Sequence, residues 1–178
     1  MFAGKHRKRY HEEKEKARLL KDSTLCLRRL GAVLQKVELV PVQSPADFKR
    51  EDNRRRAEIG GKNSLTNQFA AWEHGEEVGF LSLDIYPPDQ HPDVDWYTIY
   101  EIFVPRPLRS KGIGTRLLEA AEQAGRDRGL RYARLCAKPL DDSRTQEQLI
   151  EWYSRRGYNK MRDSSSTDMH KDLTLISD

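Results

Sequence analysis

A short basic turn with two glycines is the part of the sequence best suited to chemistry. The 178-residue chain has an apolar stretch at Ile99–Val104, and the turn that follows it contains Arg109, Lys111, Gly112 and Gly114. Glycine allows φ > 0 and lets the backbone approach a ligand closely. Free N–H groups at the start of a helix bind anions, and the helix dipole assists them. The turn therefore predicts a site for a phosphate or pyrophosphate group.

The spacing around the turn excludes two common nucleotide-binding motifs. The Walker A pattern G-x-x-x-x-G-K-[ST] is absent. A Rossmann fingerprint needs a third small residue where this chain has Leu117, and no parallel βαβ unit opens the sequence. Taken alone, Gly112-x-Gly114 is also compatible with a tight strand-to-helix turn that binds nothing.

The elements that must position the turn follow from the pattern of apolar residues. Strands are expected where β-branched and aromatic residues cluster, and helices where apolar residues recur every three to four positions. Ser143 and Gln146 form a capping-box pattern before one helix. The chain is expected to form helices over 5–34, 44–59, 112–128 and 143–156, and strands over 36–42, 68–72, 77–86, 96–104, 130–137 and 169–175. This order predicts an α/β fold, a mixed central sheet flanked by helices behind an N-terminal helical extension.

Two local motifs resemble those of the GNAT superfamily of N-acetyltransferases. Arg109-x-x-Gly112-x-Gly114, after a strand that ends in Phe103-Val104, resembles the coenzyme-A-binding motif of the family. The segment 149–158 is similar to the family's helix ending in Tyr-x-x-x-Gly-Phe, with Tyr158 in place of Phe. The resemblance covers roughly residues 37–175 in element order. It implies a GNAT-like acetyltransferase domain over 37–178 that uses acetyl-CoA as co-substrate and no metal.

The resemblance also assigns roles to individual residues. It implies that Tyr153 donates a proton to the departing sulfur, and that Gln146 stands where the family often has Asn. The strand backbone would run beside the pantetheine, and the turn amides would hold the pyrophosphate. The cofactor-binding residues implied in this way, besides Gln146, are Ile102, Phe103, Val104, Arg109, Ser110, Lys111, Gly112, Ile113, Gly114 and Thr115.

An amine acceptor needs a base. An amine like that of lysine has a pKa near 10.4, so only about one molecule in a few thousand is neutral at pH 7. Glu101, on the strand before the turn, is the nearest candidate general base. Strand alternation turns its side chain away from the face of Tyr100 and Ile102 unless a bulge intervenes. Tyr100, Asp93 and Asp95 are the alternatives.

The net charge of +4 divides unevenly along the chain. Residues 1–36 hold eleven Lys/Arg against four Asp/Glu, and residues 37–178 hold twenty-one against twenty-four. A slightly acidic domain suits a small-molecule amine, a polyamine or a protein amine as acceptor. The basic extension leaves two alternatives: a module that binds nucleic acid or a protein partner through residues 1–36, and a toxin that acetylates aminoacyl-tRNA.

Other features point to an ordinary intracellular enzyme. Cys26 and Cys136 form no disulfide pattern, and Cys136 is expected to be a small core residue in mid-strand. The five histidines show no metal-ligand spacing with these cysteines. No apolar stretch approaches the roughly 18 residues that span a bilayer. We therefore expect a cytoplasmic protein without membrane contact; a homodimer stays an open alternative.

Overall fold

The computed structural model describes residues 37–60, 62–87, 89–162 and 167–175. The predicted basic helical extension, residues 1–36, lies outside this part of the chain. The described residues form three helices, α2 (Glu51–Ile59), α3 (Ile113–Arg126) and α4 (Gln146–Ser154). The strands are β1 (Glu38–Val42), β2 (Thr66–Glu73), β3 (Glu76–Asp84), β4 (Trp96–Phe103), β5 (Tyr132–Cys136), β6 (Asn159–Lys160) and β7 (Asp168–Asp172).

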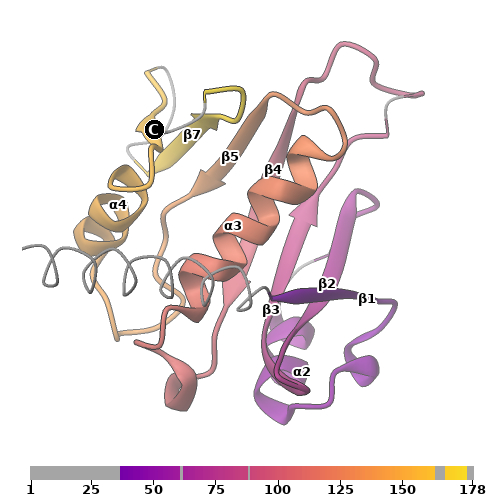
Figure 1. Cartoon of the computed structure of the whole chain (residues 1–178), viewed down its shortest axis with the longest axis vertical. Helices are drawn as coiled ribbons and strands as arrows, with labels where there is room; N and C mark the ends of the chain where they lie inside the picture. Colours follow the sequence, from indigo (N-terminus) through magenta and orange to yellow (C-terminus); the bar gives the residue numbers. More distant parts are fainter. Residues whose placement is uncertain (1–36, 61, 88, 163–166, 176–178) are drawn as a thin grey trace, which may run out of the picture. The chain divides into compact units, whose positions relative to one another are not determined.

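The seven described strands make one mixed sheet in the order β1-β2-β3-β4-β5-β7-β6. The central pair β4–β5 is parallel, because α3 crosses back over the sheet between them, and every other neighbouring pair is antiparallel (Figure 1). The α/β class predicted from the sequence is confirmed. The strands predicted over 68–72 and 77–86 pair as a hairpin, β2–β3, with His74 and Gly75 at positive φ in its turn.

Side chains alternate between two apolar layers across the sheet. On one face, Leu81, Leu83 and Ile99 pack with Leu118 and Ala121 of α3. On the other face, Phe80 and Ala70 pack with Phe48 and with Ala57 of α2. Helices α3 and α2 therefore pack on opposite faces of the sheet that contains β4.

Buried polar groups fix α2 and α3 on the sheet. The Glu77 carboxylate on β3 accepts hydrogen bonds from the backbone N–H groups of Lys49 and Arg50 and from the Asn53 side chain, at 2.6 to 3.2 Å. It thus satisfies free donors at the start of α2. The buried Tyr97 hydroxyl donates to the Ala121 carbonyl of α3 at 2.7 Å. These bonds set where the two helices lie relative to β4.

The two central strands part in the second half of β4. Their pairing runs only from Trp96–Tyr132 to Ile99–Leu135, whereas β4 continues to Phe103. A β-bulge lies at the same point, because Leu83 faces Ile99 but Ser82 faces Glu101, which leaves Tyr100 as the extra residue. The bulge reverses strand alternation, so Glu101 points to the α2 face. The β5-facing edge of β4 is thereby left open.

Several sequence predictions need correction. The predicted helix over 44–59 is a 3₁₀ turn at Pro45–Asp47 followed by α2, because Phe48 is extended and breaks the helix. The capping box of α4 is formed by Thr145 and Gln148, not by Ser143 and Gln146. The two-residue strand β6 has no counterpart in the prediction. None of the described helices is long and apolar enough to cross a membrane.

Candidate active site

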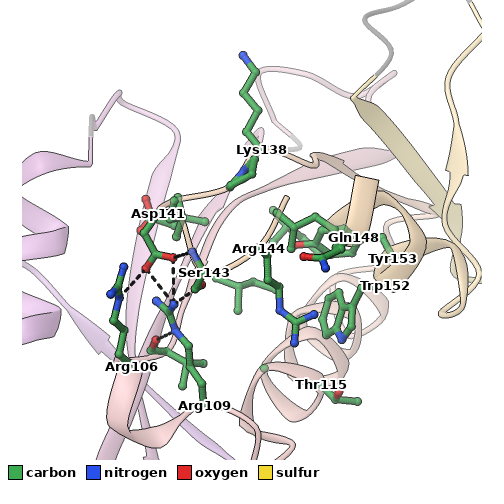
Figure 2. A pocket seen from close by; sticks show the side chains of 18 of the residues that line it. Arg106, Arg109, Thr115, Lys138, Asp141, Ser143, Arg144, Gln148, Trp152 and Tyr153 are labelled. Atoms are coloured by element: carbon green, nitrogen blue, oxygen red, sulfur yellow. Dashed lines mark hydrogen bonds and ion pairs between the residues drawn. The ribbon is translucent and has the colours of Figure 1, made fainter. Parts of the chain in front are cut away.

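A cavity of about 640 Å³ opens where β4 and β5 part. It is bounded by the second half of β4, the start of α3, the loop 138–144 and α4 (Figure 2). A volume of this size is in the range of small-molecule and cofactor sites. The described residues contain no group of three or more His, Cys, Asp or Glu side chains that could hold a metal ion.

The glycine turn presents a row of open amides to this cavity. Ser110 and Gly112 both have positive φ, and Gly112 caps the start of α3. A Cβ atom at Gly112 would also lie 2.9 Å from Nη1 of Arg116, so only glycine fits without a shift. None of the backbone N–H groups from Ser110 to Gly114 donates a hydrogen bond to a described residue. Such a row is suited to bind an anion, and the dipole of the 14-residue helix α3 adds to this.

Arg109 ties the end of β4 to the loop after β5. Its Nε donates to the Val104 carbonyl at 2.8 Å, and its Nη1 donates to the Ser143 hydroxyl at 2.7 Å and pairs with Asp141 at 2.9 Å. Hydrogen bonds from Ser143, and then the Arg109 guanidinium, hold the pKa of Asp141 well below its usual range. Arg106 also pairs with Asp141, at 3.5 Å. In this arrangement Arg109 acts as a clamp on the turn.

Arg116 holds the turn from the other side. Its guanidinium pairs with both carboxylate oxygens of Glu73, at 2.7 and 3.0 Å, and donates to the Lys111 carbonyl at 3.2 Å. Glu73 closes β2 just before the hairpin turn. The pair is largely buried, with 19% and 12% of the two side chains exposed. The hairpin therefore fixes the backbone of the turn through one ion pair that contains a charge-assisted hydrogen bond.

Tyr153, on α4, lines the cavity. Its half-buried ring packs edge-on against Trp152 and Tyr158, with ring centroids 4.8 and 5.6 Å away. The Tyr153 hydroxyl makes no hydrogen bond to any described residue. Burial raises the pKa of Tyr153 to about 12, so the hydroxyl keeps its proton at neutral pH. It is available as a proton donor.

Arg156 fastens α4 to the start of α3. Its guanidinium stacks on the Trp152 ring at 3.9 Å and donates to the Thr115 hydroxyl at 2.9 Å and to the Trp152 carbonyl at 2.8 Å. Burial lowers the pKa of Arg156 from its ordinary value. This contact sets the distance between Tyr153 and the glycine turn.

Glu101 reaches the cavity from β4 but is held by α2. Arg56 donates to both of its carboxylate oxygens, at 2.5 and 2.9 Å, and only 4% of the Glu101 side chain is exposed. The hydrogen bond to Glu101 raises the pKa of Arg56. Tyr100, on the bulge, is 49% exposed and also lines the cavity.

The structure brings together most of the residues singled out from the sequence. The cavity is lined by Glu101, Ile102, Val104, Arg109, Ser110, Gly112, Gly114, Thr115 and Tyr153. Three others point elsewhere, since Phe103 and Ile113 pack in the two apolar layers and Lys111 is exposed beside the cavity. Gln148 lines the cavity where Gln146 does not.

One prediction near the site is wrong, and several lining residues were missed. Cys136 is not a core residue, because it ends β5 on the exposed side and lines the cavity. Asp141, Ser143, Arg144 and Trp152 were not identified from the sequence. The acidic and basic run 141–144, directly before a helix, is the signal that was present for three of them.

Comparisons with known proteins agree with this architecture. A family model described as the acetyltransferase (GNAT) family matches residues 35–158. No curated protein matches the chain. The solved structure of AtaTR bound with AcCoA is 11% identical, with 78% of this chain and 94% of that chain covered and a TM-score of 0.57.

Two further solved structures share the fold. A GNAT family acetyltransferase from Elizabethkingia anophelis with acetyl-CoA bound is 12% identical, with 77% and 98% of the two chains covered and a TM-score of 0.53. An acetyltransferase from Thermus thermophilus is 17% identical, with 77% and 96% covered and a TM-score of 0.52.

The parted strands, the turn with open amides and the tyrosine of α4 are the features to which the sequence resemblance assigned the binding and reaction of acetyl-CoA. The family model covers well over half of the chain. The chain therefore belongs to the GNAT family and is an acetyl-CoA-dependent acetyltransferase.

Proposed function

We propose that the protein transfers the acetyl group of acetyl-CoA to a primary amine of a small molecule, a polyamine or a protein. The observation that carries the proposal is one cavity that joins the open amides of the turn to the protonated Tyr153 hydroxyl. An anion site and a proton donor that line one cavity suit an acyl-CoA, which carries both a pyrophosphate and a thioester.

The donor is held by backbone at two places. The N–H groups from Ser110 to Gly114 bind the pyrophosphate. The open edge of β4 at Ile102–Val104, which has no β5 partner, lies beside the amide-containing pantetheine. Binding of this kind aligns the thioester with the amine and removes several kcal/mol from the barrier. Phe103 takes part through its backbone only, because its side chain packs on the α2 face.

The chemical step needs one acid and one base. The amine nitrogen attacks the thioester carbonyl carbon, the C–S bond breaks, and the departing sulfur takes the proton of the Tyr153 hydroxyl. The amine gives its proton to Glu101 through a water molecule, because Arg56 and the burial of Glu101 keep the carboxylate away from direct contact. Tyr100 is the alternative base in the cavity, whereas Asp93 and Asp95 precede β4 and do not line it.

The test begins with acetyl-CoA binding. Calorimetric titration of the full chain should show a complex at micromolar to hundreds of micromolar acetyl-CoA. Release of CoA is then measured over panels of small amines, polyamines and peptides. Turnover of at least one amine, reduced in Tyr153→Phe and in Glu101→Gln, supports the proposal. Absence of acetyl-CoA binding at hundreds of micromolar refutes it.

A second candidate acceptor is aminoacyl-tRNA, which also presents a primary amine. The excess of seven positive charges in residues 1–36 favours it, since phosphate contacts dominate nucleic-acid affinity. Deleting residues 1–36 discriminates between the acceptors. Activity on a small amine should survive the deletion, whereas activity on aminoacyl-tRNA, or binding of a nucleic-acid or protein partner through this segment, should be lost.

A further inference from the structure

The cavity has two sides beyond the glycine turn, and they differ in charge. On one side, Arg106, Arg109, Asp141 and Ser143 form a closed network of ion pairs and hydrogen bonds (Figure 2). The guanidinium groups on this side already have a carboxylate partner. A ligand that extends past the turn in this direction would have to break the network.

The other side carries an unpaired cation. Arg144 lines the cavity, is exposed, and makes no ion pair or hydrogen bond with any described residue. Figure 2 shows its guanidinium extending toward Trp152 and toward the α3 side that carries Thr115, whereas the Lys138 side chain extends away from this group. Arg144 also contributes, after burial and Arg155, to the lowered pKa of Arg156. Arg144 therefore adds an unpaired positive charge between α3 and α4, beside Arg156, whose charge Glu119 partly offsets.

Coenzyme A continues past its pyrophosphate into a ribose that carries a 3′-phosphate. We propose that Arg144 binds this 3′-phosphate and makes the enzyme select coenzyme A over its 3′-dephospho form. The inference rests on the proposed function, because it places the pyrophosphate on the turn. A guanidinium recognises a phosphate bidentately, and a free one needs no existing pair to be broken.

The test compares two ligands and a small set of variants by calorimetry on the full chain. The unmodified protein should bind coenzyme A about 10- to 100-fold more tightly than 3′-dephospho-coenzyme A. Arg144→Gln should lose that preference by weakening only the binding of coenzyme A. Arg155→Gln is the matched control, since Arg155 is a cation of the same region that pairs with Glu151 and does not line the cavity.

Two lysines near the cavity test whether the effect is specific to Arg144. Lys138→Gln and Lys111→Gln should each leave the preference for coenzyme A over its 3′-dephospho form unchanged, because the Lys138 side chain extends away from Arg144 and Lys111 is exposed beside the cavity. Equal affinity of the unmodified protein for the two ligands overturns the inference. So does an Arg144→Gln variant that keeps the preference or weakens both ligands alike. If neither ligand binds the unmodified protein, the proposed function fails with it.

Discussion

The role of Arg109 can be decided by the direction of one affinity change. The sequence motif assigns Arg109 to the phosphate site, whereas in the structure its guanidinium is bound to Asp141, Ser143 and the Val104 carbonyl. Asp141→Asn removes the carboxylate charge and keeps the side-chain shape. If Arg109 is a clamp, the turn loses its support and acetyl-CoA binds more weakly. If Arg109 is a phosphate ligand restrained by Asp141, acetyl-CoA binds more tightly.

The expected magnitude follows from the contacts. A hydrogen bond to a charged group contributes about 1.5–3 kcal/mol. The Arg109 and Asp141 side chains are 27% and 26% exposed, so solvent screening reduces this to about 1–2 kcal/mol. We predict that Asp141→Asn raises the Kd for acetyl-CoA about 5- to 30-fold. The pKa of Asp141 is lowered, so the carboxylate is ionised at neutral pH and the clamp is lost only under strong acid.

Calorimetric titration of acetyl-CoA at pH 7 measures the change. Asp142→Asn is the matched control, because Asp142 pairs with Arg106, is 88% exposed and does not contact Arg109. The control should bind acetyl-CoA like the unmodified protein. Tighter binding by Asp141→Asn would refute the clamp and return Arg109 to the phosphate site.

Three further predictions concern the acid, the second clamp and the fold. Tyr153→Phe should lower kcat about 100-fold with little change in the KM for acetyl-CoA in steady-state assays. Because the pKa of Tyr153 is about 12, kcat of the unmodified enzyme should show no loss from tyrosine ionisation up to about pH 10 in the same assays. Glu73→Gln should raise the KM for acetyl-CoA with kcat unchanged, since the substitution frees Arg116 and loosens the turn. A fall in kcat as large as the rise in KM would contradict a positioning role. Glu77→Ala should lower the free energy of unfolding by about 3 kcal/mol in urea titrations, because it leaves three donors at the start of α2 without an acceptor; a loss below about 1 kcal/mol would contradict the contacts.

Local sequence patterns predicted the parts of the site that depend only on residues close together in the sequence. Gly112 of the turn was identifiable because positive φ restricts the residue type, and Gly112 lies in that region. The helix carrying Tyr153 was identifiable from its apolar spacing and the glycine that follows it. The order of strands and helices followed from the same reasoning.

The contacts that complete the site join residues far apart in sequence, and no local pattern contains them. Arg116 meets Glu73 across 43 positions, and Arg56 meets Glu101 across 45. The bulge at Tyr100 depends on the register between β3 and β4, which alternation within one strand cannot reveal. For this reason the sequence left the side of the sheet that Glu101 faces undecided.

The long-range pairs also change how the charge of the turn is understood. From the sequence, the turn with Arg109 and Lys111 is expected to be a basic phosphate site, and Arg116 follows it in the chain. The structure neutralises two of the three, Arg109 with Asp141 and Arg116 with Glu73. In the proposed function the backbone amides then carry most of the recognition of the pyrophosphate, and the arginines hold those amides in place. A rigid row of amides loses no side-chain entropy on binding, which favours this use of the arginines over direct phosphate contacts.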